Sequence, residues 1–182
     1  MMKKTIFVLT LIILVFTASL ELKAQSYLSV GGFLGGGYIS GNLPSQGSFT
    51  SSIFVEANTN KAFGFDTRLS FLYAANIDLL FPRNSINYYP FVRGFSIKGI
   101  VRQPISTIFF VEEGIGPLAL NDRTFSHINS WDYGIVFSIL AGTDFGNSQG
   151  KFRLGAGVEY GLTFTSTDVG YSSIHVQIQY IL

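Results

Sequence analysis

Residues 152–164 read FRLGAGVEYGLTF, and their side chains alternate strictly between two kinds. Every second position, from Phe152 to Phe164, is apolar or aromatic, whereas the positions between them hold Arg153, Glu159 and small residues. Alternation with a period of two is typical of a β-strand with two different faces. In a soluble sheet the second face would be rich in charge, because it would meet water. Here that face is mostly small, so we interpret it as the inside of a narrow barrel and the apolar face as the outside.

The same alternation recurs along the chain and predicts eight strands. Each has roughly 10 to 13 residues, and a tilted transmembrane strand needs about 9 to 11. Eight is also the smallest usual strand number of an outer-membrane barrel. The fold class is therefore predicted as all-β: an eight-stranded antiparallel up-and-down transmembrane β-barrel. The predicted strands are residues 27–39, 49–58, 62–73, 89–101, 106–116, 131–142, 152–164 and 173–182.

Two of these segments are less regular than the others. In 89–101, Arg93 falls among aromatic and aliphatic residues of the outward face, and in 106–116, Glu112 and Glu113 are adjacent. Neighbours on a strand point to opposite faces, so one of the two carboxylates must leave the polar face or lie at a strand end. A bulge or a change of register could absorb either exception.

The connections between the predicted strands alternate in length, as in barrels with long extracellular loops and short periplasmic turns. Residues 143–151 are longer, and residues 165–170 shorter, than this rule expects. The long connections are residues 41–48, 74–88 and 117–130, and the short ones are 59–61 and 102–105.

The first 24 residues have the pattern of a secretory signal peptide. Lys3 and Lys4 provide a positive start, residues 5–16 are an apolar run, and Ala24 is a small residue after which cleavage is expected. The predicted domains are therefore a signal peptide at 1–24 and a barrel at 25–182; an uncleaved anchor is the alternative. No run of about 18 apolar residues follows, so only a closed barrel could span a membrane.

Composition excludes several functional classes. Charged residues make up 13% of the chain, about half of the roughly 25% in soluble domains. Without residues 1–24, nine basic and ten acidic residues remain, a net charge of −1. That balance gives no basic footprint for nucleic acid. The chain has no Cys, so it holds no disulfide, thiolate metal site or Cys nucleophile.

The polar faces carry charges of both signs, and charges inside a narrow barrel must be paired. We predict a lumenal network of ion pairs and hydrogen bonds, with Arg153, Glu159, Arg68 and Glu56 as its chief members. His175, on the polar face of the last strand, is expected to hydrogen-bond to Gln or Glu there. The predicted lumenal residues are Glu56, Asp66, Arg68, Lys98, Glu112, Arg153, Glu159 and His175.

Aromatic residues gather near the strand ends, which predicts girdles at the two membrane interfaces. The alternative is that aromatics are simply common in strands. The predicted interface aromatics are Tyr38, Tyr73, Trp131, Tyr133, Tyr171 and Tyr180.

The signal peptide, the strand number, the Gly-x-Gly-x-Glu-Tyr-Gly run at 155–161 and the alternating last strand resemble the small outer-membrane barrel family that includes OmpX and OmpA-like domains. The resemblance covers nearly the whole mature chain. Family members usually end in an aromatic residue that the assembly machinery reads; this chain ends in Leu182, with Tyr180 two positions earlier. The resemblance implies a protein of the outer membrane, in contact with its lipid and lipopolysaccharide, assembled by the barrel-assembly machinery and without a cofactor.

Some barrels of this size modify lipid A or phospholipid, and the deacylase PagL uses a His-x-Ser-Asn motif with His as the base. In this chain residues 127–130 read HINS, with Asn and Ser transposed, so His127 is a weak catalytic candidate. No metal site is predicted, because the acidic residues in or near loops lack the spacing of Ca²⁺ ligands. Those residues are Asp122, Asp132 and Asp168.

The sequence favours a structural or surface-interaction role, through envelope integrity, adhesion or partner binding, in which the loops 74–88 and 117–130 face outward. An open pore is not expected from eight strands, and the extracellular partner stays open. One alternative is the lipid A-modifying enzyme. The other is a soluble secreted barrel that carries a ligand, as lipocalins do, which requires an apolar interior and a polar exterior.

Overall fold

The structure is a computed structural model that describes residues 27–41, 44–58, 65–81, 88–147 and 150–182. The predicted signal peptide 1–24 and the predicted strand start at 62–64 lie outside the described residues. Within the described ranges no helix is long and apolar enough to cross a membrane. The strands are β1 (Tyr27–Ser40), β2 (Gln46–Asn58), β3 (Asp66–Asn76), β4 (Phe91–Pro104), β5 (Phe109–Arg123), β6 (Ser130–Asn147), β7 (Gly150–Thr163) and β8 (Gly170–Ile181).

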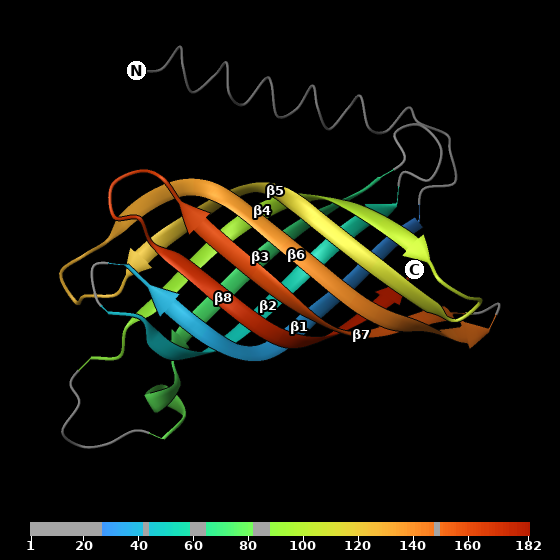
Figure 1. Ribbon diagram of the computed structural model, residues 1–182, viewed down its shortest axis with the longest axis horizontal. Coiled ribbons are helices and arrows are strands. Elements are labelled where there is room, and N and C mark those ends of the chain that lie inside the picture. Colours follow the sequence, from blue (N-terminus) through green and yellow to red (C-terminus); the bar gives the residue numbers. More distant parts are fainter. Residues whose placement is uncertain (1–26, 42–43, 59–64, 82–87, 148–149) are drawn as a thin grey trace, which may run out of the picture.

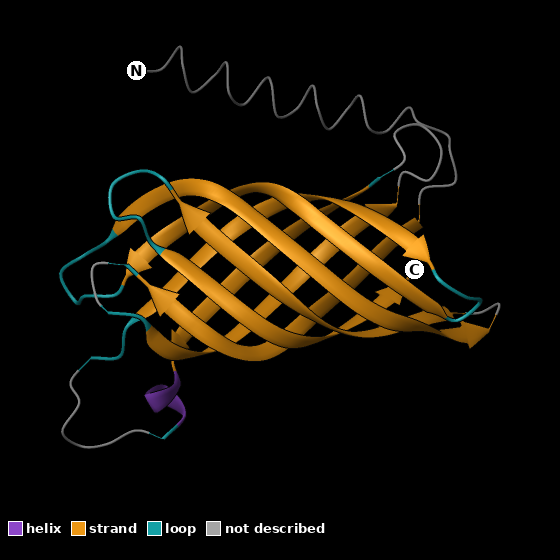
Figure 2. Cartoon of the chain, in the orientation of Figure 1, coloured by secondary structure: helices purple, strands orange, loops and turns teal. Residues whose placement is uncertain are grey.

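These eight strands form a closed barrel in which each strand pairs antiparallel with its neighbours in sequence and β8 pairs with β1 (Figure 1). A short 3-10 helix, η1 (Ile77–Leu80), follows β3. Figure 2 shows that the barrel wall consists of strands. The predicted all-β, eight-stranded up-and-down barrel is confirmed.

The two ends of the barrel differ. The end on the left in Figure 1, which we call the loop end, carries the connections β1–β2, β3–β4, β5–β6 and β7–β8. The opposite end, which we call the terminal end, holds the C-terminus and the short β4–β5 connection of residues 105–108.

Alternation along each strand separates two environments. On β8, Ile174, Val176 and Ile178 point outward and are exposed, whereas the inward His175 and Gln177 are buried. The same holds on β2, where Ile53 is 69% exposed and Glu56 is 0% exposed. The outer wall is therefore apolar along most of the barrel, and polar side chains turn inward.

The strand β5 is longer than predicted. The prediction that residues 117–130 form a loop was wrong, because β5 continues to Arg123 and buries Leu118 and Leu120 inside the barrel. Proline interrupts a strand ladder, since it has no N–H to donate. The β4–β5 pairs on either side of Pro117, Ser96↔Leu118 and Gly99↔Ile115, nevertheless keep the same register, so β5 continues beyond it.

Neither irregular segment needs a bulge. Arg93 points outward and is exposed near the loop end, where it pairs in register with Tyr73 of β3. Glu112 points inward and Glu113 points outward, with Val101 and Ile139 as its register partners. The alternation therefore continues through both segments, and Glu113 stands on an otherwise apolar stretch of the outer wall.

Candidate functional site in the barrel lumen

A ring of ion pairs fills the lumen near the terminal end. Arg68 of β3 and Arg102 of β4 both bind Glu56 of β2; Arg68 Nε lies 2.8 Å from Glu56 Oε2, and Arg102 Nη2 lies 3.0 Å from Glu56 Oε1. Both guanidinium groups also bind Glu112 of β5, each at 2.7 Å. The side chains of Arg68, Glu56 and Glu112 are 2% exposed or less and that of Arg102 is 13% exposed, so two guanidinium groups largely shielded from solvent are paired with two buried carboxylates.

Further polar groups extend this ring around the barrel. Arg102 Nη1 donates to Asp66 Oδ2 at 3.0 Å, and Arg68 Nη1 donates to Gln177 Oε1 at 3.2 Å. Gln179 Nε2 donates to Glu56 Oε1 at 2.9 Å and to Ser29 Oγ at 2.7 Å. The ring thus joins β1, β2, β3, β4, β5 and β8 through side chains as well as through the backbone ladder.

A second charged group lies farther toward the loop end. Lys98 of β4 pairs with Glu159 of β7 across the lumen, and Tyr171 Oη donates to Glu159 Oε1 at 2.6 Å. The ring of His175 stacks on Phe33, with centroids 4.0 Å apart and an interplanar angle of 19°. His175 Nδ1 has no hydrogen-bond partner among the described residues, which differs from the predicted bond to Gln or Glu; the stacking on Phe33 sets the ring's position instead.

The mouth at the terminal end holds a separate ion pair. Arg153 Nε donates to Asp144 Oδ1 at 2.8 Å, beside a cavity of about 310 Å³ that Asp66 and Arg102 also line. Arg153 was predicted to belong to one lumenal network with Glu56, Arg68 and Glu159, yet among the described residues it does not bind the central carboxylates. It lies too close to the end of β7 to reach them, and its register partner on β6 is Asp144.

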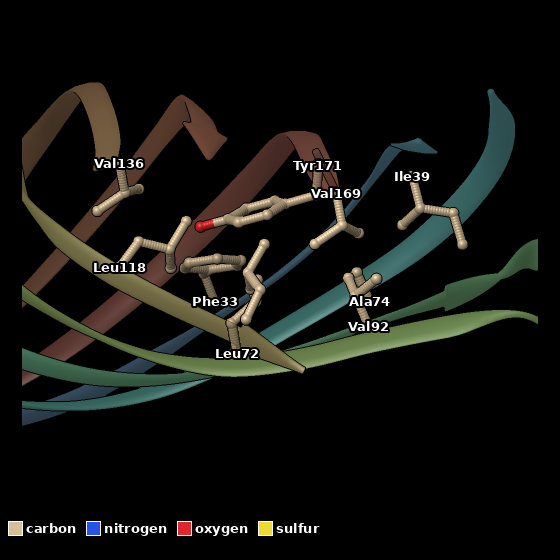
Figure 3. Packing of buried hydrophobic residues seen from close by; sticks show 10 residues of the cluster. Phe33, Ile39, Leu72, Ala74, Val92, Leu118, Val136, Val169 and Tyr171 are labelled. Atoms are coloured by element: carbon tan, nitrogen blue, oxygen red, sulfur yellow. The ribbon is translucent and has the colours of Figure 1, made fainter. Parts of the chain in front are cut away.

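The half of the lumen near the loop end holds a cluster of apolar side chains, beside short polar ones such as Thr50 and Ser173. Figure 3 shows aliphatic and aromatic side chains from several strands packed together inside the barrel. Val169, in the β7–β8 connection, joins them and is fully buried. The members of this lumenal apolar cluster are Phe33, Ile39, Leu72, Ala74, Val92, Leu118, Leu120, Val136, Val169 and Tyr171.

The structure places every predicted lumenal residue on the inward face, and Arg102 and Tyr171 are among the lumenal residues that the sequence reasoning missed. Arg102 was assigned to the short turn 102–105; it lies in β4 instead, two alternations beyond Lys98 on the same face. Tyr171 was expected among the outward aromatics. This was wrong, because Tyr171 shares its face with the inward Ser173 and His175 and is only 2% exposed. Continuing the alternation in each strand would have found both.

The other predicted interface aromatics lie on the outer wall. Tyr38 and Tyr133 are each 61% exposed, and Trp131 is 44% exposed, all toward the loop end. Tyr73, also near that end, packs its ring 5.6 Å from that of Phe91. At the terminal end, the ring of Tyr180 lies 4.7 Å from that of Phe152. These positions form two aromatic rims around the barrel.

The weak catalytic candidate His127 lies in the β5–β6 connection, exposed, with its ring 5.6 Å from that of Phe125. The carboxylates of Glu56, Glu112 and Glu159 are instead bound by arginine, lysine or tyrosine side chains. In the part of the chain that the structure describes, no group of three or more His, Cys, Asp or Glu residues could hold a metal ion.

The lumen is therefore a packed interior rather than an aqueous path. Residues that would line a channel are shielded from solvent in both halves: Lys98 is 2% exposed, and Leu120 and Val136 are 0% exposed. An interior just wide enough for side chains to fill is expected of eight strands. Its chemistry is charge neutralisation and packing, which hold the wall in one register.

Comparison with known proteins defines the class of this fold. No family model matches the chain, and no curated protein matches its sequence. Solved structures of small outer-membrane β-barrels do match, and the likeness to Neisserial surface protein A confirms the predicted OmpX/OmpA-like barrel fold.

Three of these structures illustrate the similarity. Neisserial surface protein A superimposes with a TM-score of 0.58 at 11% identity, covering 86% of this chain and 98% of that one. Ail, the attachment invasion locus protein of Yersinia pestis, gives a TM-score of 0.46 at 12% identity, covering 86% and 97%. The N-terminal β-barrel domain of Pseudomonas aeruginosa OprF gives 0.44 at 12% identity, covering 87% and 100%. At such identities, the likeness to Neisserial surface protein A concerns the fold alone.

Proposed function

We propose that this chain is an outer-membrane β-barrel with a structural or surface-interaction role, whose loop end faces the cell exterior. The observation that carries the proposal is the apolar outer wall, on which Ile53 is 69% and Ile174 72% exposed. Soluble monomers rarely expose apolar patches larger than a few hundred Å², whereas a bilayer matches such a wall. A soluble ligand carrier would need the reverse arrangement, and the buried ionic ring inside this barrel argues against it.

The rim of the loop end suits the phosphate-bearing lipids of an outer leaflet. Arg93 and Arg123 both stand on the outward side of the β4–β5 pair, and the guanidinium of Arg123 lies 5.9 Å from the ring centroid of Phe91. Arginine binds phosphate oxygens in pairs of hydrogen bonds. Contact with outer-membrane lipid and lipopolysaccharide is therefore part of the proposal. Assembly by the barrel-assembly machinery and removal of residues 1–24 remain predictions from the sequence.

Conduction is not part of the proposed role, because side chains fill both halves of the lumen. The purified protein, reconstituted in planar phosphatidylcholine bilayers, should give no single-channel steps. Steps of uniform size that depend on the amount of folded protein would contradict the filled lumen and favour a pore.

Enzymatic activity is not part of the proposed role either. His127 is exposed in the β5–β6 connection beside Phe125, and among the described residues no hydrogen bond joins it to Ser130. His127→Ala should therefore leave the lipid A acylation pattern of the expressing cells unchanged from wild type, as read by mass spectrometry. A pattern that differs between wild type and His127→Ala would favour the lipid A-modifying enzyme.

The loops are the part of the barrel that can reach other molecules at the cell surface, and this supports adhesion, envelope integrity or partner binding as the role. Their orientation can be tested directly, because the chain has no Cys. Ser126→Cys in the β5–β6 loop and Thr107→Cys in the β4–β5 turn are both exposed positions. In intact cells a membrane-impermeant maleimide should label Ser126→Cys and reach Thr107→Cys only after lysis. The opposite pattern, or equal labelling of both before lysis, would overturn the proposed placement.

A further inference from the structure

The β3–β4 connection exposes a compact run of apolar side chains. Helix η1 and the residue after it read Ile-Asp-Leu-Leu-Phe, and none of these residues is buried. Leu80 is 51% exposed and Phe81 is 75% exposed, values close to those of the outward wall. An exposed apolar patch on a loop marks contact with a membrane or another protein. We call Ile77, Leu79, Leu80 and Phe81 the η1 patch.

The η1 patch lies beside the barrel, not above it. Figure 1 shows η1 outside the wall, at about the level of the strand ends at the loop end. The Cγ2 methyl of Ile77 lies 3.8 Å from the place that a Cβ atom on Gly47 would occupy. Gly47 is on β2, in register with the outward Tyr38 and on the same face as Phe49. The patch therefore continues the outward wall at its aromatic rim.

Short hydrogen bonds hold the helix in this place. Asn76, the last residue of β3, accepts from the backbone N–H of Asp78 with Oδ1 at 2.7 Å and donates from Nδ2 to Gln46 Oε1 at 2.6 Å. Its own backbone N–H donates to Pro90 O at 2.8 Å. The start of the connection is thereby tied to β2 and to the segment before β4, which turns η1 to the outside of the barrel.

We propose that the η1 patch is an interfacial anchor that inserts among the acyl chains of the outer leaflet. This rests on the proposed outer-membrane placement and adds a lipid contact outside the strands. Hydrocarbon is favoured over a protein partner because the patch is continuous with the wall that the bilayer covers and lies alongside it. Asp78 is the one charged residue within 77–81, so the four apolar side chains of the η1 patch can insert, as in other interfacial anchors. The anchor would hold residues 77–81 at the membrane.

Tryptophan fluorescence can test this insertion, because Trp131 is the one Trp of the chain. In a Trp131→Phe background, Phe81→Trp carries a single reporter on the η1 patch, and Leu80→Trp carries a second, independent one. The full chain would be folded into dioleoylphosphatidylcholine vesicles with and without phosphatidylcholine brominated on one acyl chain. Folding of each variant is checked by the mobility shift on boiling. Both reporters should show blue-shifted emission and lose fluorescence with brominated lipid.

Two matched controls separate the possible failures. Ile53→Trp reports from the middle of the wall and should be quenched by the brominated lipid, whereas Ser126→Trp reports from an exposed loop and should respond to aqueous iodide instead. If Phe81→Trp and Leu80→Trp behave like Ser126→Trp while Ile53→Trp is quenched, the anchor is wrong and the patch faces water, as a protein-binding surface would. If Ile53→Trp is not quenched either, the outer-membrane placement itself fails.

Discussion

The two halves of the lumen are filled by side chains of different chemistry. Near the terminal end, Arg68, Arg102, Glu56 and Glu112 fill the space with paired charges, whereas near the loop end aliphatic side chains such as Leu118 and Leu120 fill it. Apolar packing needs only matching volume. Paired charges also need matching positions, since Glu56 and Arg68 are direct register partners, as are Arg102 and Glu112. We infer that the ionic half specifies the strand register, whereas the packing of the apolar half tolerates substitutions that keep the side-chain volume.

Removal of one buried charge should give the largest effect. Arg68→Leu leaves Glu56 and Glu112 with one guanidinium to share, and breaking a buried pair in this way costs about 3–5 kcal/mol of unfolding free energy. Urea unfolding of the protein in lipid vesicles, followed by the mobility shift on boiling, measures the loss. Arg93→Leu is the matched control on the outer rim and should change stability by less than about 0.5 kcal/mol. Equal losses of unfolding free energy in Arg68→Leu and Arg93→Leu would contradict the claim that the buried ionic ring stabilises the barrel.

Truncation in the apolar half should have the next largest effect. Leu118→Ala opens a cavity among tightly packed neighbours and is expected to cost about 2–5 kcal/mol. Leu118→Met keeps the volume and should cost less than about 1.5 kcal/mol. The same unfolding assay compares the two variants. If Leu118→Met costs as much as Leu118→Ala, shape matters in this half as much as in the other, and the contrast between the halves weakens.

Tyr171 belongs to both halves, because its ring lies in the apolar cluster while its hydroxyl binds Glu159. Tyr171→Phe keeps the ring and removes a hydrogen bond to a buried carboxylate, which should cost about 1–3 kcal/mol. Tyr160→Phe, on the outward face of β7, should leave stability nearly unchanged. An unfolding midpoint for Tyr171→Phe indistinguishable from that of Tyr160→Phe would show that the hydroxyl adds nothing.

Replacing a complete ion pair should have the smallest effect. Lys98→Met alone leaves Glu159 buried with only Tyr171 as a partner, whereas Lys98→Met combined with Glu159→Leu removes both charges. Apolar replacement of a whole buried pair is often neutral or stabilising. The double variant should therefore be more stable than Lys98→Met, and adding Tyr171→Phe, so that no buried hydroxyl is left without its acceptor, should bring the stability within about 1 kcal/mol of wild type. A double variant less stable than Lys98→Met would mean that this pair cannot be exchanged for packing.

Sequence alternation was sufficient to predict the barrel and most of the charged lumen, because a strand's side-chain period is fixed at two. It placed Glu56, Arg68, Lys98 and Glu159 on one face without knowledge of any contact. It failed at strand ends: Arg102 was assigned to a turn, since nothing local marks where a strand stops. Alternation also could not predict which charged side chains pair, because the pairing of Arg153 with Asp144 depends on how far along β7 and β6 each residue lies.

The sequence pattern did not predict the apolar half of the lumen, for a different reason. Phe33, Leu72 and Leu118 alternate with residues that are also apolar or small, so neither face stands out in those segments. Aromatic residues near strand ends suggested the membrane rims, and Tyr171 was placed there on residue type alone. Its inward position follows from the alternation along β8, since it shares a face with His175. Residue type thus proved a weaker guide than alternation within the same strand.

The central claim is that the outer wall meets hydrocarbon. Because the chain has no Cys, a spin label can be placed singly at Ile53→Cys, Ile115→Cys or Val176→Cys, all exposed outward positions. Power-saturation EPR in phosphatidylcholine vesicles then compares collisions with oxygen and with a water-soluble nickel chelate, using Ser126→Cys as the aqueous reference. The account predicts high oxygen and low nickel accessibility at the three wall positions. Nickel accessibility there equal to that of Ser126→Cys would contradict it.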